Sequence, residues 1–124
     1  MKMISTQNAH AAIGPYSQAL EAGGMVFVSG QLPVDPATGL MPEEVQAQAR
    51  QSLANLKAIL AAAGLTMADV VKTVVFLADL GDFAAVNEVY AEAFAQPFPA
   101  RSCVQAAGIP KGAKVEIECI AVRK

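Results

Sequence analysis

The sequence has few of the residues from which metal centres, redox sites and nucleic-acid surfaces are built. It contains one histidine, His10, and two cysteines, Cys103 and Cys119, with no Cys or His pair at ligand spacing. We therefore expect no metal site and no redox chemistry. The nine Lys and Arg are scattered among eleven Asp and Glu, which leaves no basic stripe for a phosphate backbone and disfavours nucleic-acid binding.

The chain also lacks the features that divide or export a protein. Its start, MKMISTQNAHAAIGPYS, has no apolar stretch of the kind found in a signal peptide or membrane helix, and no linker or repeat interrupts the sequence. We therefore expect a soluble, cytoplasmic protein with reduced thiols, no membrane partner and a single domain over residues 1–124. The hydrophobic fraction of 54%, against 16% charged, exceeds what one small core requires and indicates contact with another subunit.

Strand and helix signals alternate along the first half of the chain. Residues 25–32, MVFVSGQL, are rich in β-branched and aromatic residues and predict a strand, preceded by a short strand near 17–21. Apolar residues then recur at helical spacing over about residues 43–63. Pro42 suits the first turn of this predicted helix, and Gly64 suits its C-terminal cap.

The second half continues the alternation. Residues 69–78, DVVKTVVFLA, form a nearly continuous β-branched run that predicts an interior strand covered on both faces. Asp82 can cap a second helix over roughly 83–95. Residues 101–106 and 114–122 complete the chain as two strands, which we expect to form an antiparallel pair.

This order of elements predicts an α+β fold, a single mixed β-sheet with two helices packed on one face. The strands carry large apolar side chains at both odd and even positions, and therefore on both faces of the sheet. The face without helices needs a cover that the chain does not supply. Self-association is the economical explanation.

Candidate site residues lie on the last two strands. The period-two rule places Glu116 and Glu118 on the face opposite the apolar side chains of the last strand, turned toward a partner subunit, where an unpaired carboxylate is costly. Arg101 is a natural partner and alternates in phase with Cys103. If that face also carries Glu116, a guanidinium, a thiol and a carboxylate converge in a polar cleft near a subunit boundary.

Such a cleft suits the hydrolysis of a small acid. The guanidinium of Arg101 can bind a carboxylate bidentately, and the carboxylate of Glu116 can orient or deprotonate water. An ordinary interface ion pair is the competing interpretation of these two residues. Cys103 is better explained as a small apolar filler than as a nucleophile, because no histidine base is placed to activate it.

Four further residues have both a structural and a functional interpretation. Tyr16 can pack in the interior or form a pocket wall. Ser29 and Gly30 interrupt a strong strand, which indicates a bulge or a place where a ligand approaches the backbone. Asn87, inside the second helix, is either solvent-facing or functional.

Several segments together resemble the RidA (YjgF) family, and the similarity covers nearly the whole chain. The most specific part is the pairing of PARS at 99–102 with VEI at 115–117. The segments are AAIGPYSQA at 11–19, VSGQLP at 28–33, QARQSLANLKAIL at 48–60, VKTVVFLADLGDFAAVNEVY at 71–90, PARSCV at 99–104 and VEIECIAV at 115–122.

The resemblance implies a chorismate-mutase-like fold and a homotrimer with three interfacial active sites. It implies hydrolysis of 2-iminopropanoate and 2-iminobutanoate, products of pyridoxal-phosphate-dependent dehydratases, to 2-keto acids and ammonia without a cofactor. In this sequence Arg101 would bind the substrate carboxylate, Glu116 would position the attacking water and Cys103 would line the site near the imine. Tyr16, Ser29, Gly30 and Asn87 match family pocket positions. The connection AFAQPFPARS at 93–102 is shorter than in many relatives.

Other functions compete with this one. A trimer that binds small carboxylates, or acts like a chaperone, without turnover would use the same clefts. Ribonuclease activity has been ascribed to some family members, but the acidic balance of this chain argues against it. Chorismate mutase activity does not follow from a shared fold.

Overall fold

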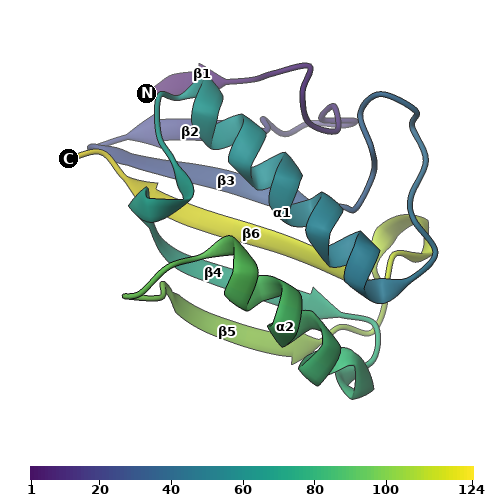
Figure 1. The fold of residues 1–124 in the computed structure, drawn as a ribbon. Coiled ribbons are helices and arrows are strands. Elements are labelled where there is room, and N and C mark those ends of the chain that lie inside the picture. The colour runs from purple at the N-terminus through teal and green to yellow at the C-terminus, as the bar shows by residue number, and fades with distance from the viewer.

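The protein forms one mixed six-stranded sheet with both α-helices on one of its faces, as predicted (Figure 1). The structure, a computed structural model, describes residues 1–124. Neither helix combines the length and the apolar composition that crossing a membrane requires. The elements are β1 (Lys2–Ile4), β2 (Ala19–Ala22), β3 (Met25–Gln31), α1 (Val45–Ala62), β4 (Val70–Leu77), α2 (Phe83–Ala93), β5 (Ala100–Gln105) and β6 (Val115–Val122).

The ends of α1 are fixed by local hydrogen bonds. The Glu44 side chain accepts from the backbone N–H of Gln46 at 2.9 Å and so caps the N-terminus of the helix. Pro42 therefore precedes the helix, and its predicted place in the first turn is wrong. Gly64 follows the last turn with a φ of 75°, a left-handed conformation that glycine adopts without strain, and the predicted C-terminal cap is confirmed.

The start of α2 differs from the prediction that Asp82 caps it. A short 3-10 turn, Leu80–Asp82, leads directly into the helix, and the side chain of Asp82 makes no capping hydrogen bond. Asp79 caps this turn instead, because its carboxylate accepts from the backbone N–H of Gly81 at 2.8 Å.

The expectation that the last two strands pair with each other is wrong. The strand order across the sheet is β1-β2-β3-β6-β4-β5, in which β5 is parallel to β4 and β6 is antiparallel to both β3 and β4. The cause is α2, which carries the chain from the end of β4 back to the start of β5 and makes these strands parallel neighbours. β6 then fills the space between β3 and β4 that the α1 crossover leaves open.

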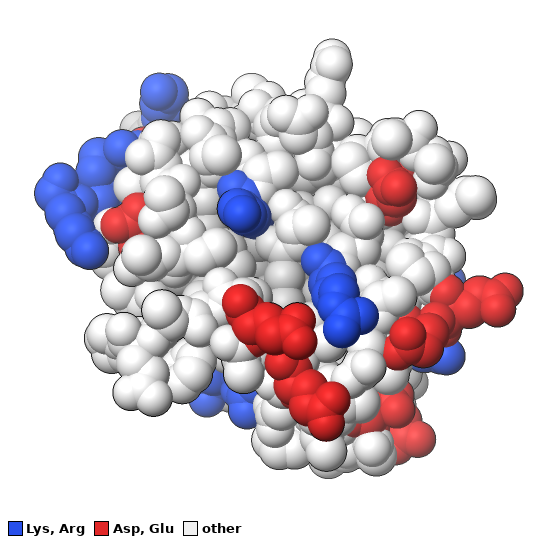
Figure 2. Space-filling model, viewed as in Figure 1, with Lys and Arg blue, Asp and Glu red and all other residues white.

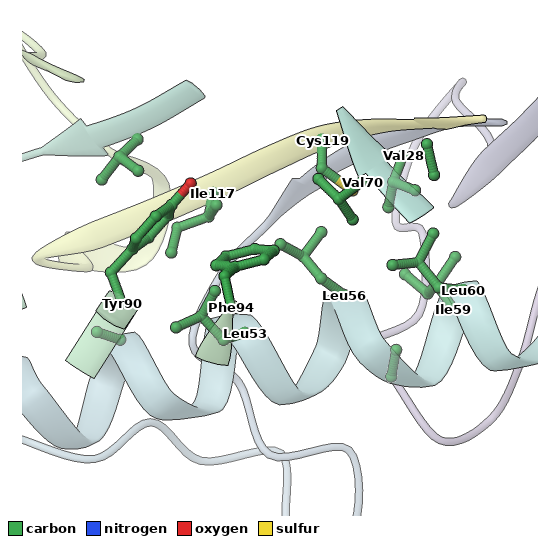
Figure 3. Packing of buried hydrophobic residues seen from close by; sticks show 14 of the residues in the cluster. Val28, Leu53, Leu56, Ile59, Leu60, Val70, Tyr90, Phe94, Ile117 and Cys119 are labelled. Atoms are coloured by element: carbon green, nitrogen blue, oxygen red, sulfur yellow. The ribbon is translucent and has the colours of Figure 1, made fainter. Parts of the chain in front are cut away.

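The core lies between the sheet and the two helices. The apolar side chains of β6 face the helices and are buried, as predicted: Val115, Ile117, Cys119 and Ala121. Figure 3 shows Tyr90 and Phe94 projecting from α2 into this layer toward Ile117. Because β6 is central, its packing joins both helices to one core.

The second face of the sheet has no cover within the chain. Phe27 of β3 and Val104 of β5 are 43% and 44% exposed, and Phe76 of β4 is only half-buried. The prediction that residues 69–78 form an interior strand is confirmed, but the helices cover only one face of that strand. This apolar surface also carries Glu116, which the register places opposite Phe76.

Candidate active site

Arg101 lies on the edge strand β5 with its guanidinium packed against α2. The strand register aligns it with Thr73, a buried residue of the helix-covered face. Nη1 of Arg101 donates to Asn87 Oδ1 at 2.7 Å, and Cζ lies 4.8 Å from the ring centroid of Tyr90 and 5.4 Å from that of Phe83. None of the three ion pairs in the chain includes Arg101, so its charge contacts only neutral partners.

Cys103 follows two positions later on the same face of β5. Its side chain is half-buried and packs against the hydrophobic core. Burial raises the pKa of the Cys103 thiol, and the nearby charge of Arg101 opposes that shift only in part. The thiol therefore stays protonated at neutral pH, which favours a packing role over a nucleophilic one. Asn87, Arg101 and Cys103 are called the arginine half-site below.

Glu116 and Gly30 lie against each other where β3 meets β6. The pairing of these strands shifts register between Val28 and Gln31, which confirms the predicted bulge at Ser29 and Gly30. A Cβ built on Gly30 would lie 2.7 Å from Oε2 of Glu116 and 3.0 Å from its Cδ. The missing side chain at Gly30 thus provides the space that the carboxylate occupies.

Ser29 and Tyr16 complete the surroundings of this carboxylate. The Ser29 hydroxyl donates to the backbone carbonyl of Ser17 at 2.6 Å, which ties the bulge to the segment before β2. Tyr16, on that segment, is exposed. Tyr16, Ser29, Gly30 and Glu116, called the glutamate half-site below, line one hollow of about 470 Å³.

The environment of Glu116 makes its carboxylate more basic than usual. Burial raises the pKa of Glu116 above its ordinary value of 4.5, and the negative charge of Glu118, two residues later, raises it further. No Lys or Arg of the chain forms an ion pair with it. A carboxylate that is half-buried and not neutralised by a cation is suited to accept a proton from water.

The two half-sites do not meet within one chain. The condition for their convergence, a shared face of the sheet, is not met within one chain, because Arg101 aligns with Thr73 on the helix-covered face while Glu116 aligns with Phe76 on the open face. Their strands are separated by β4, and from strand geometry we estimate about 14 Å between the two Cα atoms. No intrachain ion pair forms between them.

Four residues that contact Arg101 or line the hollow beside Glu116 were not predicted as functional. Two of them are Phe83 and Tyr90, which with Asn87 form one stripe of α2, at spacings of four and three, that faces Arg101. Lys111, with a φ of 61°, lines the hollow of the glutamate half-site together with His10. For Lys111 and His10 the sequence offers no periodic signal, since both lie in irregular segments.

The fold and these half-sites define a small α+β protein whose polar residues lie at a sheet edge and an uncovered sheet face. The family model for endoribonuclease L-PSP (Ribonuc_L-PSP) matches residues 6–123, and the chain belongs to this family, the RidA/YjgF family, as its sequence motifs predict.

Individual relatives cover the whole chain. A Salmonella typhimurium protein named 2-iminobutanoate/2-iminopropanoate deaminase is 59% identical over 99% of this chain and 98% of its own. The crystal structure of TdcF from Escherichia coli with bound serine is 55% identical, covers 100% of both chains and has a TM-score of 0.95. RidA from the Antarctic bacterium Psychrobacter is 49% identical over 98% of this chain and 99% of its own, with a TM-score of 0.96.

Replacing Gly30 by alanine should displace Glu116 without unfolding the protein. The added Cβ meets the carboxylate, the movable end of a side chain, and Gly30 does not have a positive φ, so we expect a stability change within about 1 kcal/mol. A crystal structure of Gly30→Ala should show the carboxylate moved, and thermal unfolding should give a near-normal Tm. Gly108→Ala, where no atom lies within 4 Å of the added Cβ, is the matched control. If the Glu116 carboxylate kept its position in Gly30→Ala, the missing side chain at Gly30 would not be what provides its space.

Proposed function

We propose that the protein hydrolyses small 2-imino acids, 2-iminopropanoate and 2-iminobutanoate, to 2-keto acids and ammonia. The observation that carries this proposal is the guanidinium of Arg101, which is held by Asn87 and two aromatic rings and has no carboxylate partner in its own chain. A preoriented, unpaired guanidinium favours bidentate binding of a substrate carboxylate. The name of the Salmonella relative, at 59% identity, supports the same substrate class.

In the proposed reaction, Glu116 acts on water while Arg101 holds the substrate. The iminium carbon is already electrophilic, so no cofactor is needed, and the enzyme must hold the acid, place a water about 3 Å from that carbon and manage protons. Glu116 accepts a proton from the water as its oxygen bonds to carbon. Glu116 then passes this proton to nitrogen, and as the C–N bond breaks the hydroxyl group gives its own proton back to Glu116 and becomes the keto carbonyl. Ammonia and the keto acid leave, and the ammonia takes up the remaining proton.

The remaining residues of the half-sites have supporting roles in this proposal. Cys103 lines the cleft near the imine as a neutral thiol, in keeping with the raised pKa that burial gives it. Tyr16, Ser29 and Gly30 form the wall and floor beside Glu116. Asn87 orients Arg101 through its hydrogen bond.

A complete site then requires two chains, and we propose a homotrimer with three interfacial active sites. Arg101 lies on an edge strand, Glu116 faces the uncovered apolar side of the sheet, and the two are too far apart within one chain to hold one small substrate. Burying the open face against a neighbour would remove apolar surface from water and bring one half-site of each type together.

We further propose that residues 1–124 act as one domain and that the protein works in the cytoplasm. The sheet and both helices contribute to one core of 22 buried residues. The two cysteines are free thiols, as suits a reducing compartment.

Endoribonuclease activity, the function in the description of the family model, has less support here. The formal net charge is −2, and Figure 2 shows Lys and Arg interspersed with Asp and Glu on the face that carries the helices. RNA binding ordinarily needs a basic groove with stacking aromatic side chains. A trimer that binds small carboxylates without turnover is the stronger alternative, because it would use the same guanidinium.

A coupled assay tests turnover and separates the two charged residues. Threonine dehydratase generates the imine, and wild-type protein should accelerate keto-acid release over spontaneous hydrolysis. Arg101→Ala removes a contact worth about 2 to 4 kcal/mol, so kcat/KM should fall roughly 30-fold to 1000-fold and keto-acid binding should be lost in calorimetry. Glu116→Gln should lower kcat by about 100-fold while keto-acid binding survives.

The outcomes of this assay are distinct. Binding of 2-oxobutanoate without acceleration by the wild-type protein would favour the binding module. If Glu116→Gln lost ligand affinity as badly as Arg101→Ala while the assembly stayed intact, the two residues would form an interface ion pair.

Mixing the two inactive variants tests the interfacial site. Arg101→Ala chains keep Glu116, and Glu116→Gln chains keep Arg101, so mixed trimers should contain intact sites. Random one-to-one assembly should restore about one quarter of wild-type activity, because each cleft draws one half-site from each of two chains. Light scattering should give a trimer mass for all samples. Mixed trimers without any recovered activity would contradict a site shared between chains.

The pH profile should report the raised pKa of Glu116. Because a base must be ionised, kcat/KM should fall as the pH drops through that pKa, with the acidic limb above pH 4.5. Glu118→Gln removes the second cause of the shift, so the limb should move to lower pH while the maximal rate is kept. A limb that does not move in Glu118→Gln would mean that another group controls it.

A further inference from the structure

The guanidinium of Arg101 packs against one face of α2, and a residue of that face is hydrogen-bonded to the sheet. Phe83, Asn87 and Tyr90 all contact it, and the Tyr90 ring is the nearer of the two aromatic rings, at 4.8 Å from Cζ against 5.4 Å. Asn87 engages only Nη1, which leaves the other guanidinium donors for a ligand. The direction in which these remaining N–H groups point therefore depends on the plane of the aromatic ring against which the guanidinium stacks.

The plane of the Tyr90 ring is set by a buried hydrogen bond to β4. Tyr90 Oη lies 2.7 Å from Thr73 Oγ1, and both residues are buried. Thr73 is also the residue that pairs with Arg101 in the parallel β4–β5 ladder. Figure 3 shows the hydroxyl end of Tyr90 pointing from α2 toward the sheet. The same position of β4 thus aligns the backbone of Arg101 and, through Tyr90, its guanidinium.

We infer that Thr73 and Tyr90 are positioning residues for Arg101: their hydrogen bond fixes the Tyr90 ring, and the ring orients the guanidinium fork toward the substrate carboxylate. The inference rests on the proposed role of Arg101. A bidentate contact needs both N–H groups in the plane of the carboxylate, so a tilted guanidinium loses one of the two bonds even though its charge is kept. The alternative is that Tyr90 only fills the core.

Nuclear magnetic resonance tests the positioning without relying on activity. In wild-type protein the Arg101 side-chain N–H signals, assigned by their loss in Arg101→Lys, should be resolved, because an immobilised guanidinium rotates slowly, and they should be displaced by the aromatic rings. In Thr73→Val and Tyr90→Phe these signals should broaden and shift. Unchanged signals in both folded variants would overturn the inference, whatever the protein does to imino acids.

Ligand binding and kinetics give the second measurement, with 2-oxobutanoate as the probe. Tyr90→Leu should raise the Kd for 2-oxobutanoate and the KM about fivefold to thirtyfold, with a smaller change in kcat, because the carboxylate is held in ground and transition states alike. Tyr90→Phe keeps the ring but loses the hydrogen bond to Thr73, so it should raise the Kd and the KM in the same direction, by less than Tyr90→Leu. Val89→Ala, a buried change on α2 in a groove beside α1, is the matched control and should lower the Tm without altering KM.

The outcomes separate this inference from the proposed function. If Tyr90→Leu fails to fold, Thr73→Val and Tyr90→Phe decide the matter through the same two measurements. A KM raised equally by Val89→Ala would show that any loosening of α2 has this effect and would overturn a specific role for Tyr90. If wild-type protein neither binds 2-oxobutanoate nor accelerates hydrolysis, the proposed function fails, and the resonance signals still decide whether Tyr90 orients Arg101.

Discussion

The alternation of side chains along a β-strand is the constraint on which the candidate site depends. Because successive residues of β6 point to opposite faces, its apolar side chains pack against the helices while Glu116 lies on the open face. The same rule sends Arg101 of β5 to the helix-covered face. A guanidinium and a carboxylate that shared a face would neutralise each other, and neither would be free for a ligand. The sheet keeps them apart within each chain.

Arg101 and Glu116 are held by different kinds of neighbouring groups, and each kind suits the charge that it surrounds. Arg101 is held by a neutral amide and by aromatic rings, which orient a cation without cancelling its charge. Glu116 is accommodated by an absent side chain at Gly30 and made more basic by burial and by Glu118. One group is therefore ready to bind an anion and the other to take a proton, which is the division of roles that hydrolysis of an imino acid needs.

Local sequence patterns were sufficient for most elements but not for their arrangement. Apolar periodicity predicted both helices and five of the six strands, and a glycine within a strand predicted the bulge at Gly30. The partner of β5 was not predictable in this way, since pairing depends on how α2 returns the chain. For the same reason, the face of Arg101 relative to that of Glu116 stayed open at the level of sequence. The role of Tyr90 was not predictable either, because its contact with Arg101 joins a helix to a strand, and the sequence of α2 alone does not indicate which strand lies beside it.

The central place of β6 has a consequence for the order in which the molecule can mature. Because β6 is the last of the six strands in chain order yet lies between β3 and β4, the middle of the sheet stays incomplete until β6 has been synthesised and has paired. Until then, two neighbouring strands present unpaired backbone edges and an open core to other nascent chains. Truncation by even a few residues at the C-terminus should therefore do more harm than truncation at β1, which pairs along one edge only. The pairing of β6 with its two neighbours is therefore the step that commits the chain to the native sheet.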